Sequence, residues 1–566
     1  MKTIKVLMCF LLLCLAGCQA KETHVVNVVL EQREGYEAES YAIQALRHED
    51  IAFRLTESEG YRIVSCDYEN AKLTRTNECL WLELPDVKYN ERIHLKLHEA
   101  TRTMTYEDGM GQHIVMPVLD THERVNTEID LFENSGHTQI GWRTEDGVLV
   151  GLGSRTEANK TLYAEWMEWT DERFFSFEEI KGQRVIAHCS YEGDTVVVPG
   201  NVDGIKANAF AHSKVKTVVL PKGLVFIEGN AFVDSSLETL YVFDDIVSVS
   251  DYAFRGSRLK TLHINAVESP VYSKTYYATF ADKMDRLMHM KDDKKIVLFS
   301  GSSTRFGYDS AMIDDAFEGY GVVNMGVFAY TNALPQMEMI RCFMNEGDIL
   351  VHSPEFDAAQ RQFCTTTKLD APFFNMLEAN YDLLSLLDLR QYGNVFTAFH
   401  GYLVDKETME ADRYETTPSD YDENGNPVPS PSYNAYGDYV AYRENASNSL
   451  PVYGLEVNYT KDALGYETFV KYLNAEYQKF LAMGIQVYFT YAPRNRLALS
   501  TESTQEAILA LDNHLRETLV VPVISNIFDS LVDGRYLYGT DNHLTTQGVE
   551  IRTKMIIEEL KGAMDG

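Results

Sequence analysis

The middle of this chain repeats itself every 22 residues, between about residues 195 and 264. An Ala-Phe pair recurs at this interval, and other residue types recur in the same register. The matching positions are Ala209-Phe210, Ala231-Phe232 and Ala253-Phe254; Thr217, Thr239 and Thr261; Val215, Leu237 and Leu259; Ile205, Ile227 and Val249; and Pro199 and Pro221. A period in this range predicts a solenoid, in which each unit buries its apolar face against its neighbours. Three units are about the minimum for stability, so we expect a short array capped by its flanking domains.

This pattern resembles the BspA-like class of leucine-rich repeats, and we place the array at residues 180–266. The resemblance implies one of two roles. The array is either a surface for adhesion and for binding other surface proteins, or a spacer that holds the next domain away from a membrane.

The N-terminus has the features of an export signal. Lys2 and Lys5 precede a short apolar stretch that ends in Leu15-Ala16-Gly17-Cys18. This stretch is shorter than the roughly 20 residues that span a bilayer. Its end resembles a bacterial lipobox, which implies removal of residues 1–17, lipidation of Cys18, and an extracytoplasmic lipoprotein anchored to the membrane at the cell surface. The alternative is an ordinary signal peptide with an incidental cysteine.

The charge of the chain limits its partners. The formal net charge is −33, and it becomes −35 once residues 1–17, with their two lysines, are removed. Such a surface repels nucleic acid and anionic lipid, so we expect no nucleic-acid partner. The alternative is that the acidity serves only solubility. The cysteines after residue 18 lack C-x-x-C spacing, so we predict no metal site; a Cys66–Cys79 disulfide is compatible with export.

Two β-rich parts precede the repeats. Residues 18–100 alternate apolar and polar positions, as in the run 25–30, which predicts strands. Residues 101–169 continue in strands and end in two segments that carry Trp142 and Trp166. These tryptophans and the Gly-rich turn between them resemble the internalin B-repeat family of bacterial surface modules. That resemblance implies a structural role for both tryptophans in a small β-core.

From about residue 268 onward, expected strands and helices alternate. The expected strands are 296–299, 322–327, 349–351, 486–490 and 519–524, and the expected helices are 309–318, 332–345, 466–483, 502–517 and 548–560. This alternation predicts a three-layer α/β domain with a mostly parallel sheet at residues 268–566. Ligands of such sheets bind at the carboxyl ends of the strands. Gly301, Ser303 and Gly326 all fall at such ends.

Three residues at the two ends of this segment suggest acyl transfer. Ser303 follows the first strand, and Asp541 and His543 lie about 240 residues later. Residues two apart share a side in extended or loop backbone, so Asp541 can hold one nitrogen of the His543 ring while the other faces the Ser303 hydroxyl. Each motif alone is typical of an ordinary turn. Their combination in one α/β segment indicates a serine nucleophile.

With these residues the segment resembles the SGNH/GDSL hydrolase family. The resemblance implies that Ser303 is the nucleophile, that the N–H groups of Ser303 and Gly326 form the oxyanion hole, and that Asp541 and His543 complete the triad. The two-residue spacing of acid and base is similar to the alginate O-acetyltransferase subgroup. The family's Gly-x-Asn-Asp block is missing from residues 347–355, so an oxyanion donor worth about 10²–10³ in rate is lost unless Asn332 or Ser353 substitutes.

An insertion at residues 401–460 is rich in tyrosine, proline and asparagine. It either walls a substrate cleft, with tyrosines stacked on sugar rings, or packs on itself as a surface excursion. Its Asp420-x-Asp422-x-Asn424 run opens like a calcium loop, but Pro431 replaces the bidentate glutamate. Arg494, at the end of a late strand, is a candidate contact for an anionic substrate, and Asn332 is a second candidate substrate contact.

Two functions follow from these patterns. The first is a cell-surface lipoprotein whose SGNH-type serine esterase or O-acyltransferase domain acts on acyl esters, with acetyl expected, of a polysaccharide. The second is a surface binding or adhesion protein with a degenerate SGNH domain that binds carbohydrate or other surface proteins. We expect no cofactor in either case, because the chain has no nucleotide, phosphate or flavin motif.

Overall fold

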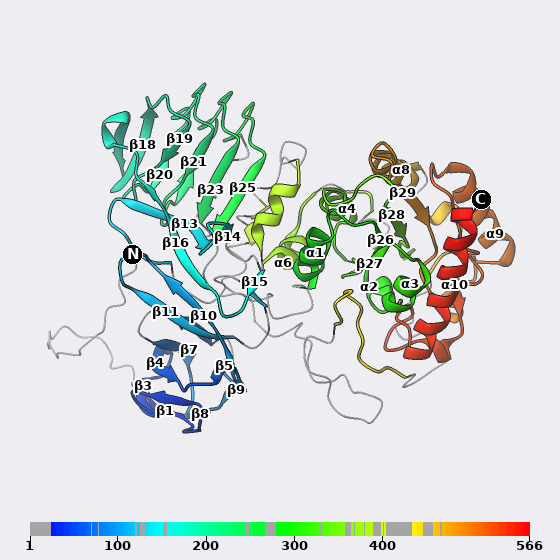
Figure 1. The fold of residues 1–566 in the computed structure, drawn as a ribbon, viewed down its shortest axis with the longest axis horizontal. Coiled ribbons are helices and arrows are strands. Elements are labelled where there is room, and N and C mark those ends of the chain that lie inside the picture. Colours follow the sequence, from blue (N-terminus) through cyan, green and yellow to red (C-terminus); the bar gives the residue numbers. More distant parts are fainter. Residues whose placement is uncertain are drawn as a thin grey trace. The chain divides into compact units, whose positions relative to one another are not determined.

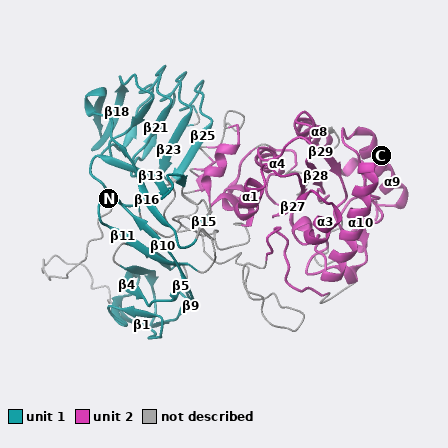
Figure 2. Ribbon diagram, in the orientation of Figure 1, with its two compact units in different colours: residues 1–270, 407–411 teal, residues 271–406, 412–566 magenta. Residues whose placement is uncertain are grey.

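The computed structural model describes residues 24–68, 71–76, 79–118, 122–124, 131–150, 155–243, 248–250, 252–265, 279–328, 330–356, 364–366, 368–378, 380–388, 395, 398–399, 401–402, 433–444, 457–464 and 467–565. Cys18, the calcium-like run and most of the insertion lie outside these residues. The chain divides into two compact units, residues 1–270 with 407–411 and residues 271–406 with 412–566 (Figure 2).

The first unit begins with an all-β module. Its strands are β1 (Val25–Leu30), β2 (Tyr36–Ala38), β3 (Ala42–Leu46), β4 (Glu49–Glu57), β5 (Tyr61–Cys66), β6 (Lys72–Arg75), β7 (Leu80–Val87), β8 (Glu91–Ile93) and β9 (Leu95–Glu99). They form sheets in the orders β3-β1-β8, β2-β4-β7-β6 and β5-β9. Alternate residues of β1 and β7 are buried in one core, as the period-two pattern predicts.

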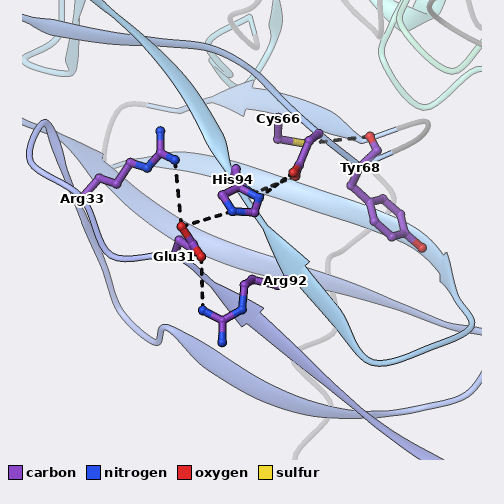
Figure 3. A network of polar contacts seen from close by, with 7 residues as sticks. Glu31, Arg33, Cys66, Tyr68, Arg92 and His94 are labelled. Atoms are coloured by element: carbon purple, nitrogen blue, oxygen red, sulfur yellow. Dashed lines mark hydrogen bonds and ion pairs between the residues drawn. The ribbon is translucent and has the colours of Figure 1, made fainter.

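A polar network joins separate parts of this module (Figure 3). The His94 ring lies 2.6 Å from an Asp67 carboxylate oxygen and 3.2 Å from one of Glu31, and Glu31 also pairs with Arg92 at 3.1 Å. These side chains are 27–68% exposed, so water screens the pairs and each adds little stability. The Cys66 of this region forms no disulfide with Cys79 or with any other described cysteine.

The second β module contains the two tryptophans. Its strands are β10 (Arg102–Glu107), β11 (His113–Val118), β12 (His122–Arg124), β13 (His137–Thr144), β14 (Leu149–Val150), β15 (Arg155–Glu157) and β16 (Thr161–Glu168), and the main sheet has the order β11-β10-β16-β13-β14. Trp142 is fully buried, with its ring edge-on to Tyr106 at 4.8 Å. The Trp166 Nε1–H donates to the Asp108 carbonyl at 3.1 Å. Both tryptophans therefore serve the core of the module.

The repeat region forms two sheets of parallel strands (Figure 1). It contains η1 (Glu172–Phe174), β17 (Phe175–Ile180), β18 (Gln183–Cys189), β19 (Thr195–Val197), β20 (Gly204–Ile205), β21 (Thr217–Val219), β22 (Phe226–Ile227), β23 (Thr239–Phe243), β24 (Ser248–Val249) and β25 (Thr261–Asn265). Thr217 pairs with Thr239, and Thr239 with Thr261, which confirms the 22-residue register. Thr195 adds one more strand to this ladder. The antiparallel hairpin β17–β18 ends the other sheet.

The second unit is built on a parallel sheet with the order β27-β26-β28-β29. Its elements are α1 (Thr279–His289), β26 (Lys295–Phe299), α2 (Ser302–Arg305), α3 (Ser310–Ala316), β27 (Gly321–Asn324), α4 (Ala333–Arg341), β28 (Ile349–His352), α6 (Ala371–Leu377), η3 (Tyr381–Leu386), η4 (Asp462–Leu464), α8 (Glu467–Leu481), β29 (Gln486–Phe489), β30 (Arg494–Asn495), η5 (Arg496–Ala498), α9 (Gln505–Thr518), β31 (Leu531–Val532), η6 (Gly534–Tyr536) and α10 (Thr546–Asp565).

Helices cover both faces of this sheet. On one face, Leu298 packs in a core with Ile313 of α3 and Ile556 of α10, and Figure 1 shows these two helices together. On the other face, His352 of β28 bonds through Nδ1 to the Tyr477 hydroxyl of α8 at 2.7 Å. Alternate residues of a strand point to opposite faces, which explains this division. No described helix is long and apolar enough to cross a membrane.

Every element predicted for this unit except the last strand has an observed counterpart, with ends that differ by up to five residues, whereas α1 and α6 were not predicted. The strand expected over 322–327 ends at Asn324, because the Asn324 side chain accepts the Gly326 N–H at 2.9 Å and turns the chain. The segment expected to be extended at 519–524 contributes only an isolated bridge between Phe489 and Val523. Pro522, which has no N–H to donate, interrupts further pairing there.

Candidate functional site

Ser303 lies one turn beyond the carboxyl end of the central strand β26. Gly301, in extended backbone, is the N-cap of α2, and Ser303 is the second residue of that short helix. The Ser303 side chain is fully buried, and its Oγ has no hydrogen-bond partner among the described residues. A buried hydroxyl without a partner is unfavourable in a purely structural position, so this serine is a candidate for chemistry.

Gly326 lies against the same helix. A Cβ atom at this position would come within 2.3 Å of the Arg305 backbone nitrogen, so only glycine allows this approach. The Gly326 N–H donates to the Asn324 side chain, and its carbonyl accepts a hydrogen bond from Lys283 Nζ. Gly326 is therefore close to the nucleophile, but its N–H group already has a partner in this structure.

Asp541 and His543 lie in the loop that leads into α10. The Thr540 hydroxyl oxygen accepts the His543 N–H at 2.9 Å, which sets the start of the loop. Asp541 is buried, and its Oδ1 accepts the Asn495 side-chain N–H at 2.9 Å. The His543 ring forms no hydrogen bond to Asp541 or Ser303 within the described part of the chain. The predicted triad is thus not linked by hydrogen bonds in this structure.

One carboxylate joins the two distant segments. Glu355, which is 3% exposed, accepts the Ser303 N–H on Oε1 at 2.9 Å. Its Oε2 accepts a hydrogen bond from the side-chain amide of Asn542, the residue before His543. The structure therefore brings the serine segment and the histidine segment to the same carboxylate.

Phe306 brings His543 close to the helix that carries the serine. The His543 ring stacks on Phe306 with centroids 4.2 Å apart and an angle of 24°. The guanidinium groups of Arg305 and Arg443 lie over the same phenyl ring at 4.3 and 5.1 Å. Both arginines are buried. His543 thus lies in an aromatic and cationic environment.

This environment keeps the imidazole neutral. Burial, and then the positive charges of Arg305, Arg443 and Arg494, lower the pKa of His543 well below its ordinary value. A neutral imidazole can accept a proton from an alcohol. Lys283 is affected in the same way, because burial and the nearby Arg305 charge lower its pKa to about 7.

The described end of the insertion packs onto this site. The Asp438 carboxylate accepts hydrogen bonds from the Ser310 hydroxyl at 2.7 Å and from the Asn324 side chain at 2.8 Å. Tyr439 is buried and its ring contacts Phe306 at 4.7 Å. Arg443 comes from this segment. Three tyrosines of the insertion, Tyr402, Tyr439 and Tyr459, are buried packing residues. Tyr414, Tyr421 and Tyr453 lie outside the described residues.

Of the other side chains predicted to serve the site, Arg494 acts on His543, whereas Asn332 and Ser353 bond to other groups. Arg494 is buried in β30, and its charge acts on His543. Asn332 lies at the start of α4, and its side-chain amide donates to the Lys368 carbonyl. Ser353 exchanges hydrogen bonds with the hydroxyls of Tyr308 and Thr490 at 3.1 and 2.7 Å. Neither Asn332 nor Ser353 thus points its polar group at Ser303 in this structure.

A cavity of about 30 Å³ borders the site. Glu355, Gly301 and His352 contribute to its wall, with apolar side chains such as Phe299 and Phe328. This volume holds one or two water molecules and no sugar ring. Binding of an ester at Ser303 therefore requires movement of the surrounding side chains.

Sequence reasoning missed Glu355 and Asn542. A signal was present for each, since Glu355 follows the buried strand β28 and Asn542 lies between the two predicted triad residues. Polar residues at the carboxyl ends of parallel strands are the usual source of ligand contacts. The hydrogen bond between Glu355 and Asn542 could not be predicted from the sequence, because 187 positions separate the two residues.

The fold and the site define a two-unit protein with an array of β repeats and an α/β domain that holds a buried serine near a neutral histidine. Residues 182–282 match the BspA type leucine-rich repeat region, in a model of six copies. This match confirms the leucine-rich repeats, and repeats of this type are typical of bacterial surface proteins. No curated protein matches the chain.

Proposed function

We propose that the protein is a bacterial surface lipoprotein, anchored through Cys18, whose C-terminal domain is an SGNH-type serine esterase or O-acyltransferase. Its substrate would be an acyl ester, with acetyl expected, on a polysaccharide. The observation that carries this proposal is the Glu355 carboxylate, which bonds both the Ser303 N–H and the Asn542 amide. It holds a nucleophile segment and a base segment together at the carboxyl end of a parallel sheet, where such sites are found.

The chemistry would follow the serine pattern. His543 accepts the hydroxyl proton of Ser303 as Oγ attacks the carbonyl carbon of the ester, and the carbonyl electron pair moves onto oxygen. When this intermediate collapses, the C–O bond to the sugar breaks and the sugar oxygen takes the proton from His543. Water or a sugar hydroxyl then attacks the acyl-serine by the same steps. The products are a free acid or a new ester.

The proposed mechanism needs a small rearrangement. The His543 ring must turn from Phe306 toward Ser303, with Asp541 accepting the hydrogen bond of its other nitrogen. Asn495 already fixes the Asp541 carboxylate from one side.

Substitution of the serine tests the proposal. Ser303→Ala is expected to abolish turnover of an acetyl ester and covalent labelling by a fluorophosphonate, while the neighbouring Ser302→Ala leaves both measurable. Ser302 begins α2 but is only partly buried. Unchanged turnover in Ser303→Ala would remove this residue from the mechanism.

One observation favours a second function, a binding or adhesion protein with an inactive α/β domain. The Ser303 side chain is inaccessible, and its backbone N–H, the first oxyanion donor, is occupied by Glu355. On this alternative the repeats and the β modules perform the function. Folded protein that resists the fluorophosphonate under all conditions supports it.

A further inference from the structure

The expected oxyanion site lacks one donor in this chain. The Gly-x-Asn-Asp asparagine is absent after β28, and the Gly326 N–H is bonded to Asn324. The Asn332 and Ser353 side chains have partners elsewhere. A tetrahedral intermediate at Ser303 would thus have only the Ser303 N–H, unless another group takes the place of the missing amide.

Asn542 is positioned to be that group. Its side-chain Nδ2 and the Ser303 N–H donate to the two oxygens of one carboxylate. Its Oδ1 accepts a hydrogen bond from the Thr540 hydroxyl at 2.9 Å. Because that bond identifies the oxygen end of the amide, the NH₂ end faces Glu355. Two converging N–H donors are what a developing oxyanion requires.

Glu355 has the properties of an internal occupant rather than a permanent ligand. It is buried, and the two hydrogen bonds that the described residues give it come from neutral groups, the Ser303 N–H and the Asn542 amide. A buried carboxylate held by neutral donors is costly to desolvate, so a competing anionic oxygen can replace it. The small cavity that Glu355 lines gives this side chain room to move.

We propose that Asn542 supplies the second donor of the oxyanion hole and that the Glu355 carboxylate fills this hole until the substrate displaces it. This inference rests on the function proposed above. During attack, the Ser303 Oγ–carbon bond forms, the proton passes to His543, and the carbonyl π pair becomes the oxyanion. The Ser303 N–H and Asn542 Nδ2 donate to that oxyanion after Glu355 has moved away.

The experiment measures the second-order rate of fluorophosphonate labelling, because the phosphonyl oxygen enters the same hole as an ester oxyanion. In that reaction the Ser303 Oγ–phosphorus bond forms, fluoride leaves, and His543 takes the proton. Asn542→Ala and Asn542→Asp are expected to slow labelling by about 10²–10³. Glu355→Gln, which keeps the shape but loses the charge, and Glu355→Ala are expected to accelerate labelling at least about tenfold, the equivalent of one lost hydrogen bond to a charged group.

The controls separate folding from chemistry. Asn513→Ala changes an exposed asparagine of α9 and is expected to label like the unmodified protein. Near-ultraviolet circular dichroism of each variant verifies the fold, and acetyl ester turnover by Asn542→Ala should fall in kcat with little change in KM.

Two results would contradict the inference in distinguishable ways. If Ser303 labels but neither Asn542 variant is slowed, or if both Glu355 variants are slower than the unmodified protein, the oxyanion assignment is wrong while the esterase proposal survives. If the unmodified protein and both Glu355 variants all stay unlabelled although folded, the esterase proposal fails and this inference fails with it.

Discussion

The imidazole of His543 stacks on the ring of Phe306, with the two centroids 4.2 Å apart. Phe306 ends the short helix that carries Ser303, so the base segment packs directly on the nucleophile segment. The same phenyl ring carries the guanidinium groups of Arg305 and Arg443. The arginines that lie over Phe306 are therefore also the cations that lower the pKa of the proposed base, His543.

The first prediction concerns the pH dependence of turnover. Because burial and nearby cations lower the pKa of His543 from its ordinary 6.5, the acid limb of kcat/KM should have its midpoint below pH 6.5. Arg443→Gln removes one of the charges that disfavour the imidazolium, so the acid limb should move to higher pH. Lys554→Gln, an exposed cation of α10, is the matched control and should leave the limb in place. A limb that stays fixed or moves to lower pH in Arg443→Gln would contradict this electrostatic account.

The second prediction concerns stability in acid. Burial lowers the pKa of His352 to about 3. Between pH 6.5 and about 3, this side chain therefore binds a proton in the unfolded state but not in the folded state. The free energy of unfolding should therefore fall as the pH drops from 6.5 to about 3, by at most about 1.4 kcal/mol for each pH unit. In His352→Phe/Tyr477→Phe, which also removes the partnered hydroxyl, this dependence should flatten.

The measurement must follow the second unit alone. All 4 tryptophans of the chain, at positions 81, 142, 166 and 169, belong to the first unit. Tryptophan fluorescence therefore reports unfolding of the first unit, and near-ultraviolet circular dichroism of tyrosine reports the second when the tryptophan signal is unchanged. An equally steep pH dependence in the double variant would show that other groups cause it.

Much of the fold could be predicted because its signals are local. The repeats are recognisable from residues that recur every 22 positions, such as Thr217, Thr239 and Thr261. The strands of the parallel sheet are short apolar runs that end at Gly or polar residues. The site is less local. Whether Glu355 meets Ser303 and Asn542 depends on contacts across 52 and 187 positions, which no periodicity encodes.

The approach of Arg443 to the site was hidden for a related reason. It belongs to an insertion whose composition predicts a loop. Long-range hydrogen bonds fix that loop end on the domain, among them those of Asp438 to Ser310 and Asn324. The Arg443 N–H also donates to the Thr546 hydroxyl at 2.9 Å. Sequence reasoning also named Asn332 and Ser353 as the side chains that could substitute for the missing donor. Their side chains instead satisfy neighbouring polar groups, as buried polar groups generally must.

A third prediction concerns the buried ion pair between Lys295 and Asp348, whose charged atoms are 2.7 Å apart. Lys295→Met leaves a buried carboxylate without its cation and should destabilise the second unit by about 3–5 kcal/mol. The double variant Lys295→Met/Asp348→Asn removes both charges. The amide oxygen of the new asparagine can still accept one of the backbone N–H groups that Asp348 binds in the unmodified protein, so the free energy of unfolding should fall less than in Lys295→Met. Lys554→Met, which breaks an exposed pair with Glu550, should cost below about 1 kcal/mol. A double variant less stable than Lys295→Met would refute this account of the pair.

The last prediction concerns the phenylalanine stack of the repeats. Phe232 lies between Phe210 and Phe254, with centroid distances of 4.8 and 5.2 Å, and it is fully buried, whereas Phe254 is partly exposed. Phe232→Ala should therefore cost about 3–5 kcal/mol, because it opens a cavity that neighbours on both sides cannot fill. Phe254→Ala should cost less, since water already reaches its position. Tryptophan fluorescence during urea unfolding compares the two, with Trp169 as the nearest reporter in sequence. Each unit of a repeat array is stabilised mainly by its neighbours. An equal loss of unfolding free energy in both variants would therefore mean that the phenylalanine stack does not couple neighbouring repeats.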